Sequence, residues 1–110
     1  MYLASPYSDP DPKIQELRFK QVCIVAGKML AQGRMIFSPI AHTHSIAQAT
    51  DLPTDWEFWS RYDKTMLRQA AEFGILCLTG YTKSKGVIAE IKISEYLELP
   101  TFYFDPKDWL

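Results

Sequence analysis

The chain has 110 residues, of which 47% are hydrophobic, and a formal net charge of −1; this is sufficient for a single domain over residues 1–110 with a core of ordinary size. No cluster of lysine and arginine offsets the charge, which argues against a nucleic-acid polymer as partner. No apolar run approaches the length of a transmembrane helix, and the chain starts in an expected strand rather than a signal peptide, so we expect a cytoplasmic protein with no membrane partner.

The N-terminal half of the chain predicts two strands and one long helix. Residues 2–5 form the first apolar strand. After a proline-rich loop, Asp11 is expected to cap a helix over residues 12–32, with proline at its first position and glycine directly after its end. Residues 35–38 form a second strand, and residues 40–51 are expected to be a loop with at most a short helix.

The C-terminal half predicts two more strand and helix pairs. A capping box with Thr54 as N-cap opens a helix over residues 54–72. The apolar run at residues 73–79 is typical of a buried parallel strand. A helix over residues 86–97 and a final strand at residues 101–104 follow.

The alternation of short apolar strands with helices determines the expected fold class. Connections of this kind favour parallel pairing through right-handed crossovers. We therefore expect an α/β protein, a flavodoxin- or Rossmann-like three-layer sandwich with a four- to five-stranded parallel sheet. In such a sheet, the turns that follow the carboxyl ends of the strands face the ligand crevice.

The turn after the expected strand at residues 73–79 contains Ser84, Gly86 and Glu90 in a Ser-x-Gly-x-x-x-Glu pattern. Ser84 supplies a hydroxyl, and Gly86 lets the backbone approach a phosphate or sugar at a helix N-terminus. Glu90 lies opposite the arc that carries the other charged residues of its helix, so its carboxylate is expected to face inward. An inward carboxylate serves either catalysis or a structural ion pair, and its position in a cleft favours catalysis.

A second carboxylate, Asp63, falls within the apolar stripe that Trp56 begins on the helix at residues 54–72. One interpretation is a buried aspartate paired with Arg18 or with a tyrosine. The functional alternative is that Asp63 and Glu90 face a common pocket as proton donor and nucleophile. Paired carboxylates take these two roles when their environments separate their pKa values.

Further polar side chains are expected near the carboxyl ends of the strands. Tyr2 is either a core aromatic or the source of a functional hydroxyl. Ser5 lies at the exit of the first strand, and Tyr7 lies in the loop over the crevice, where both are candidate substrate contacts. Arg18 is on the apolar side of the first helix, where it is either the partner of Asp63, which is favoured, or a ligand for an anion.

The histidines and cysteines do not predict a metal site. His42 and His44 follow the strand at residues 35–38 without a nearby cysteine or further histidine, so a substrate contact, assigned to His42, is favoured over a metal ligand. Cys23 falls in an expected helix and Cys77 in an expected buried strand, a pattern of free structural thiols. We expect neither a metal nor an organic cofactor.

Taken together, these residues resemble the nucleoside 2-deoxyribosyltransferase superfamily, which includes the 2-deoxynucleoside 5-monophosphate N-glycosidases. The chain is most similar to short bacterial and phage domains within it, and the resemblance spans almost the whole chain. The Ser-x-Gly-x-x-x-Glu turn is its most specific part. The matching segments are Tyr2-Leu3-Ala4-Ser5-Pro6, Phe37-Ser38-Pro39, Tyr62-Asp63 and Ser84-x-Gly86-x-x-x-Glu90.

The resemblance implies a role for each matching residue. Glu90 would attack the anomeric carbon of the sugar, and Asp63 would assist the departing base. Ser84 would help to bind the 5-phosphate or 5-hydroxyl, and Tyr2 would orient the glutamate. The implied substrate is a small nucleoside or nucleotide.

The residues fit this chemistry independently of the resemblance. Cleavage of an N-glycosidic bond passes through an oxocarbenium-like sugar, which a carboxylate stabilises while an acid protonates the leaving base. Glu90 and Asp63 supply that pair, so the leading hypothesis is hydrolysis or transfer at the N-glycosidic bond of a deoxynucleoside or deoxynucleotide. One alternative is a nucleotide-binding or sensing module without turnover. Another is a structural interaction domain, with both carboxylates paired to Arg18 or a lysine and the crevice closed.

The aromatic residues of the helix at residues 54–72 predict a homodimer or larger homo-oligomer. This helix carries more large aromatic side chains than one face can bury, and Phe58 points away from the apolar stripe. Exposed aromatic clusters of this kind usually mark an interface. The alternative is that Phe58 packs under the segment at residues 40–51.

Overall fold

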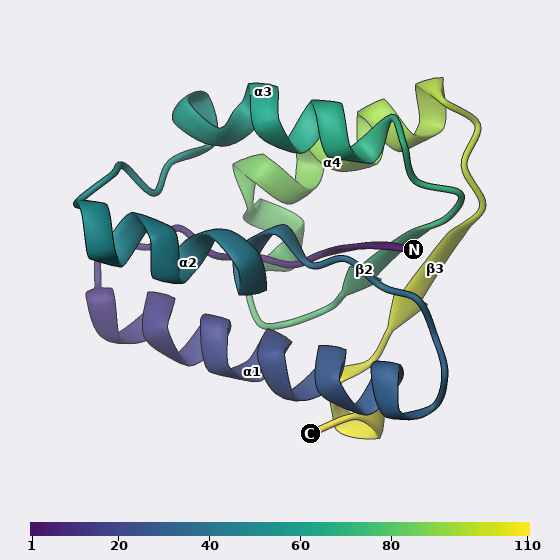
Figure 1. Ribbon diagram of the computed structural model, residues 1–110, viewed down its shortest axis with the longest axis horizontal. Helices are drawn as coiled ribbons and strands as arrows, with labels where there is room; N and C mark the ends of the chain where they lie inside the picture. The colour runs from purple at the N-terminus through teal and green to yellow at the C-terminus, as the bar shows by residue number, and fades with distance from the viewer.

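The computed structural model describes residues 1–110 and contains three strands and four α-helices (Figure 1). No helix is long and apolar enough to cross a lipid bilayer. The elements in chain order are β1 (Tyr2–Ala4), α1 (Pro12–Ala31), α2 (Pro39–Thr50), α3 (Trp56–Leu67), β2 (Phe73–Leu76), the 3-10 turn η1 (Tyr81–Lys83), α4 (Lys85–Tyr96), β3 (Thr101–Phe104) and the 3-10 turn η2 (Pro106–Asp108).

The sheet is parallel and has the strand order β1-β2-β3, with Tyr2 opposite Phe73 and Phe73 opposite Thr101. The α/β class and the parallel pairing are therefore confirmed, but the expected four to five strands are wrong. Only Phe37 of the expected strand at residues 35–38 pairs with β1, as a single parallel bridge to Tyr2. The physical reason is that the proline after this segment already begins α2, which leaves no length for a ladder.

Helices cover both faces of the sheet, because successive side chains of a strand point to opposite sides. On one face, Tyr2 and Phe73 pack with Leu67 of α3 and Val87 of α4. Figure 1 shows these two helices together on one side of the sheet.

The other face of the sheet packs against α1. Leu3 and Leu76 meet Val22, Val25 and Met29, and all five side chains are fully buried. Burial of each aliphatic side chain of this size contributes about 1.5–3 kcal/mol relative to an exposed one. This packing fixes the second half of α1 against the sheet.

The segment at residues 40–51, expected to be largely a loop, is the helix α2. Ser38 is its N-cap and accepts a hydrogen bond from the backbone N–H of Ala41 at 3.1 Å, with Pro39 at the first position. Asp51 ends the helix in a left-handed conformation with φ of 60°. A polar N-cap followed by proline is a strong helix start, and it outweighs the polar composition of the segment.

The remaining helices lie close to their expected positions. Asp11 caps α1 and accepts from the backbone N–H of Lys13 at 2.9 Å, and α4 begins directly after Ser84. In α3 the N-cap is Asp55 rather than Thr54, because the Asp55 carboxylate accepts from the backbone N–H of Phe58 at 3.0 Å. This helix also ends at its twelfth residue, several residues earlier than expected, because the chain must turn back into β2.

Candidate functional site

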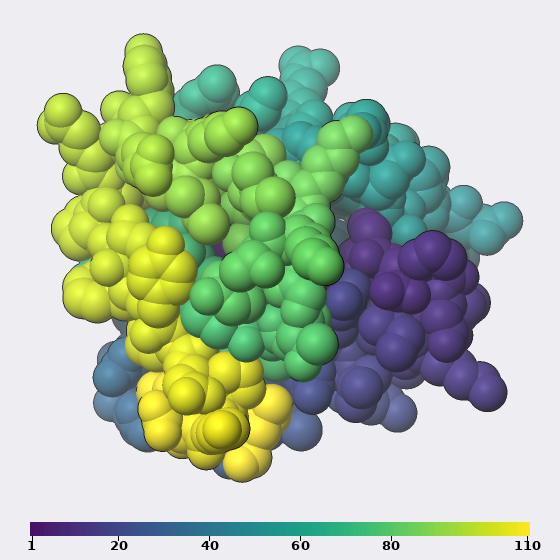
Figure 2. Space-filling model, turned by 180° about the vertical axis from the view of Figure 1, so that it is seen from behind, coloured from purple at the N-terminus to yellow at the C-terminus, as the bar shows by residue number.

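A pocket of about 310 Å³ lies at the carboxyl ends of β1 and β2. Its walls come from the loop after β1, one side of α2, the first turns of α3 and the start of α4. Figure 2 shows the loop after β1 in purple and the segment that leads into α4 in green on the same face of the molecule. Open α/β sheets bind their ligands at this edge, where the loops of neighbouring strands diverge.

Glu90 of α4 reaches the pocket from its buried wall and is 4% exposed. The hydroxyl of Tyr2, on β1, donates a hydrogen bond to Oε2 of Glu90. The other oxygen, Oε1, lies towards Gly86, 3.9 Å from the position that a Cβ on this glycine would take. Tyr2 therefore holds one oxygen of the carboxyl group and leaves the other on the side of the α4 N-terminus.

Burial determines the acidity of Glu90 and Tyr2. Loss of solvation, followed by the negative charge of Asp63, raises the pKa of Glu90 to about 8, and the hydrogen bond from Tyr2 acts in the opposite direction. Burial and the neighbouring Glu90 also raise the pKa of Tyr2, so its phenol stays protonated and remains a donor.

Asp63 of α3 lines the same pocket. Burial raises the pKa of its carboxyl group to about 7. Neither an ion pair nor a hydrogen bond within the protein engages this side chain. The structure therefore brings Asp63 and Glu90 to one pocket and leaves Asp63 free to meet a ligand.

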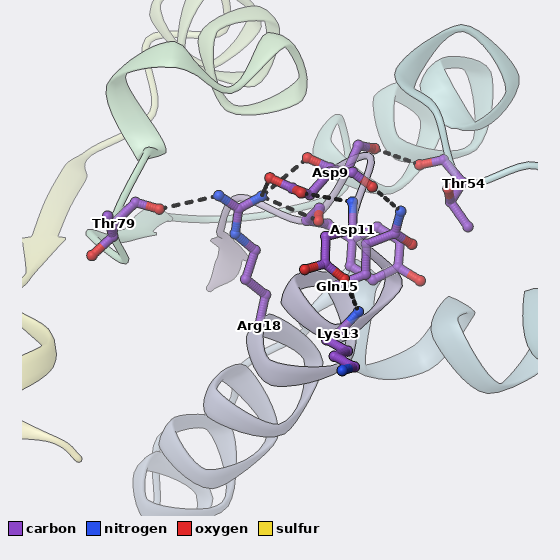
Figure 3. A network of polar contacts seen from close by, with 9 residues as sticks. Asp9, Asp11, Lys13, Gln15, Arg18, Thr54 and Thr79 are labelled. Carbon is purple, nitrogen blue, oxygen red and sulfur yellow. Dashed lines mark hydrogen bonds and ion pairs between the residues drawn. The ribbon is translucent and has the colours of Figure 1, made fainter.

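Arg18 lies outside the pocket, where it joins the loops after β1 and β2 (Figure 3). Its guanidinium donates to the carbonyls of Tyr7 at 3.3 Å, Ser8 at 3.0 Å and Thr79 at 3.3 Å, and it lies 4.0 Å from the Asp9 carboxylate.

The expected pairing of Arg18 with Asp63 is therefore wrong. Gly80 explains this placement, since it has a positive φ of 92° and a Cβ there would lie 2.9 Å from the guanidinium. Arg18 braces the loops that form the pocket and is not among the residues that line it.

Two serines expected to contact a substrate do line the pocket. Ser84 is the N-cap of α4, and its Oγ accepts from the backbone N–H of Val87 at 3.3 Å. Ser5 is 4% exposed, and its Oγ has no hydrogen-bond partner in the protein. A buried hydroxyl without a partner costs about 1–3 kcal/mol, so Ser5 is suited to a ligand that satisfies it.

The histidine in the pocket is His44, not His42. The expected contact, His42, packs its ring against Tyr62, with ring centroids 6.3 Å apart, and is not among the lining residues. His44 is 5% exposed and forms hydrogen bonds to Tyr7 and Glu16. Sequence reasoning missed it because residues 40–51 were expected to be a loop. The Ser38-Pro39 helix start is the signal that places His44 on a helix.

Sequence reasoning did not place Trp56, Glu57 or Trp59 in the pocket. Trp56 and Trp59 form part of the wall, and the indole N–H of Trp59 donates to the carbonyl of Pro53 at 2.7 Å. Lys85 forms an ion pair with Glu57 across α3 and α4. No group of three His, Cys, Asp or Glu side chains is placed to hold a metal ion.

Comparison with known protein families assigns the chain to a family. No curated protein matches the chain. The model of a family described as a domain of unknown function, DUF1937, matches residues 1–105, which include every residue of the pocket. The chain therefore belongs to the DUF1937 family.

Proposed function

We propose that the protein cleaves or transfers the N-glycosidic bond of a deoxynucleoside or deoxynucleoside 5-monophosphate. The observation that carries this proposal is the pair of carboxyl groups, Glu90 and Asp63, in one pocket with their pKa values raised to about 8 and about 7. Such a pair titrates as a unit near neutral pH, and the reactive form is the singly protonated one in which Glu90 is ionised and Asp63 carries the proton.

In the proposed reaction, Oε1 of Glu90 attacks the anomeric carbon and forms a glycosyl ester. The bond between this carbon and the base nitrogen breaks, and its electrons leave with the base. Asp63 donates its proton to the base, and its carboxylate then accepts a proton from water, which attacks the ester and releases free sugar and Glu90. A second base in place of water gives a transferase.

The hydrogen bond from Tyr2 supports the assignment of the nucleophile to Glu90. A donated hydrogen bond favours the ionised carboxylate, and it is made to Glu90 and not to Asp63. The bond also fixes the orientation of the carboxyl group, because Oε2 is held while Oε1 remains on the side of Gly86.

The size and walls of the pocket fit a nucleoside or nucleotide. A volume of about 310 Å³ is at the lower end of the range for small-molecule sites. Trp56 and Trp59 offer flat apolar surfaces to a base, and Ser84 and Lys85 lie at the N-terminus of α4, where an anionic group is stabilised.

The strand order supports a flavodoxin- or Rossmann-like assignment of the fold. The chain leaves β1, passes through α1 and pairs at Phe37 on one side of β1, and it later returns as β2 on the other side. This change of direction places a switch point next to β1, where folds of this type bind ligands. The pocket lies at this point.

Four residues that carry the resemblance to the nucleoside 2-deoxyribosyltransferase superfamily come together in space. Asp63, Ser84 and Glu90 line the pocket, and Tyr2 contacts Glu90. Tyr2 comes from β1, Asp63 from α3, and Ser84 and Glu90 from the start of α4, so the convergence of these three elements does not follow from sequence proximity. We accordingly favour a reaction of cytoplasmic nucleotide metabolism.

The test is incubation with a panel of ribonucleosides, 2-deoxynucleosides and their 5-monophosphates, each with and without a second base, followed by chromatography for free or exchanged base. We expect free base from at least one deoxy compound. Binding of a nucleotide without its consumption would instead indicate a sensing module. The absence of both binding and turnover across the panel would contradict the proposal.

A further inference from the structure

Glu16, His44 and Tyr7 form a chain of hydrogen bonds that runs from the surface of α1 through α2 to the pocket. Nε2 of His44 lies 2.9 Å from Oε2 of Glu16, and Nδ1 of His44 lies 2.6 Å from the Tyr7 hydroxyl. Tyr7 and His44 line the pocket, whereas Glu16 is half-exposed on the opposite side of the imidazole.

The packing holds the imidazole of His44 in one orientation. Phe19 stacks on it with ring centroids 4.0 Å apart, and Tyr7 meets it edge-on at 5.5 Å. One face of the ring is stacked and both of its nitrogens are hydrogen-bonded, so these contacts hold the ring in one orientation. The chain of Glu16, His44 and Tyr7 is therefore fixed by packing as well as by hydrogen bonds.

The acceptor at one end determines the direction of both hydrogen bonds. A carboxylate only accepts, so Nε2 of His44 carries the proton that faces Glu16. In a neutral imidazole Nδ1 is then an acceptor, and the Tyr7 hydroxyl donates to it. Burial raises the pKa of Tyr7 and the negative charge of Glu16 raises it further, so the phenol keeps the proton that it donates.

We propose that Glu16 and His44 are positioning residues that direct the hydroxyl proton of Tyr7 towards His44. The Tyr7 oxygen is then presented to the pocket as a hydrogen-bond acceptor. The ligand group that meets it must then be a donor, an O–H of the sugar or an N–H of the base. This inference rests on the proposed function for its ligand class. It makes Tyr7 a residue that determines specificity in addition to contacting the substrate.

The tautomer of His44 tests the direction of the hydrogen bonds in this chain in the absence of a ligand. The chain has two histidines, so nitrogen NMR of histidine-labelled protein at neutral pH, with His42→Gln for assignment, reports both nitrogens of His44. We expect a protonated Nε2 and a bare Nδ1 in the wild type. We expect a mixture of tautomers in Glu16→Ala but not in Glu95→Ala, a matched change at an exposed glutamate. A protonated Nδ1 in the wild type would make Tyr7 a donor and would overturn the proposal.

Binding calorimetry tests the ligand assignment in a Glu90→Gln background, where substrate is not consumed. The probe is whichever of the four common 2-deoxynucleosides binds most tightly, together with its analogues that lack the 3-hydroxyl, the 5-hydroxyl or the N–H donor of the base. Tyr7→Phe is expected to weaken binding of the parent about tenfold, since one hydrogen bond is lost. Tyr7→Phe should not change the affinity of the analogue that lacks the group that donates to Tyr7. That analogue therefore identifies which group of the ligand is the donor.

Two outcomes separate failure of this inference from failure of the proposed function. Tight binding that Tyr7→Phe leaves unchanged for every probe would overturn the inference and leave the proposed function intact. If neither a deoxynucleoside nor a deoxynucleoside 5-monophosphate binds, the proposed function and this ligand assignment both fail, whatever tautomer His44 adopts.

Discussion

At the scale of single residues, the distinctive feature of the pocket is a pair of carboxyl groups that the fold shields from water. Glu90 and Asp63 have pKa values raised mainly by burial, and the hydrogen bond from Tyr2 opposes this effect at Glu90. The sequence predicted both carboxylates because each interrupts the pattern of its own helix. It did not predict the places of Arg18 and His44, because their partners lie on other elements and no periodicity within one helix records them.

The hydroxyl of Tyr2 is predicted to set the pH dependence of turnover. Its hydrogen bond lowers the pKa of Glu90, so Tyr2→Phe raises that pKa further and leaves less of the carboxyl group ionised at neutral pH. We expect a bell-shaped pH–rate profile whose two limbs belong to the carboxyl pair as a unit, at pH values of about 7 and about 8. In Tyr2→Phe we expect a shift to higher pH and a maximum about 10 to 100 times lower.

The matched control for this change is Tyr62→Phe, which removes a hydroxyl from the neighbouring helix face without removing a hydrogen bond to Glu90. Its pH–rate profile should coincide with that of the wild type. An unshifted profile in Tyr2→Phe would show that Tyr2 does not act on the carboxyl pair.

We predict that the loss of turnover in Asp63→Asn increases with the basicity of the leaving group. If it protonates the departing base, Asp63→Asn impairs natural nucleosides strongly but has little effect on substrates with an activated leaving group, which need little protonation. Steady-state kinetics on both substrate types measure this difference. Equal losses on the two types would assign Asp63 a structural role.

At the scale of elements, helix starts decide which side chains reach the pocket. Ser38 starts α2 and thereby places His44, and Ser84 starts α4 and thereby places Glu90. The sequence predicted most of the helices because their caps are local signals. It predicted too many strands, because pairing depends on a partner strand and on the length left between two helices, which Phe37 illustrates with its single bridge.

Ser84→Ala and Ser38→Ala are predicted to have equal effects on stability and unequal effects on turnover. Each removes an N-cap hydrogen bond, of 3.3 Å and 3.1 Å respectively, and should lower the free energy of unfolding by about 1 kcal/mol. Ser84 lines the pocket and Ser38 does not, so Ser84→Ala should reduce turnover by about tenfold and by more than Ser38→Ala does. Urea denaturation and rate measurements together check this, and equal turnover in both variants would remove Ser84 from the substrate site.

At the scale of the whole molecule, several large apolar side chains remain at the surface. Phe58 of α3 is 46% exposed and stacks edge-on against Trp59, so it does not pack beneath α2. The edge strand β3 also exposes Phe102 and Tyr103. Apolar surface of this kind is typical of a subunit interface.

We predict that the protein is a homodimer or larger assembly with Phe58 in the interface. Light scattering during size exclusion at micromolar concentration should give a multiple of the 12.7 kDa chain mass. Phe58→Glu should dissociate the assembly, whereas Tyr96→Glu, at an exposed position on α4, should not. A wild-type monomer would refute the prediction, and a dimer that survives Phe58→Glu but dissociates with Tyr103→Glu would move the interface to β3.

The rate of base release by Glu90→Gln tests the account most directly. The substitution keeps the shape of the side chain and removes the nucleophile, so turnover should fall by a factor of about a thousand or more, equivalent to about 4 kcal/mol. Glu95→Gln, at an exposed position on the same helix, should retain wild-type turnover, and both variants should show the circular dichroism of the wild type. Turnover within about tenfold of wild type in a folded Glu90→Gln protein would contradict the assignment of Glu90 as the nucleophile.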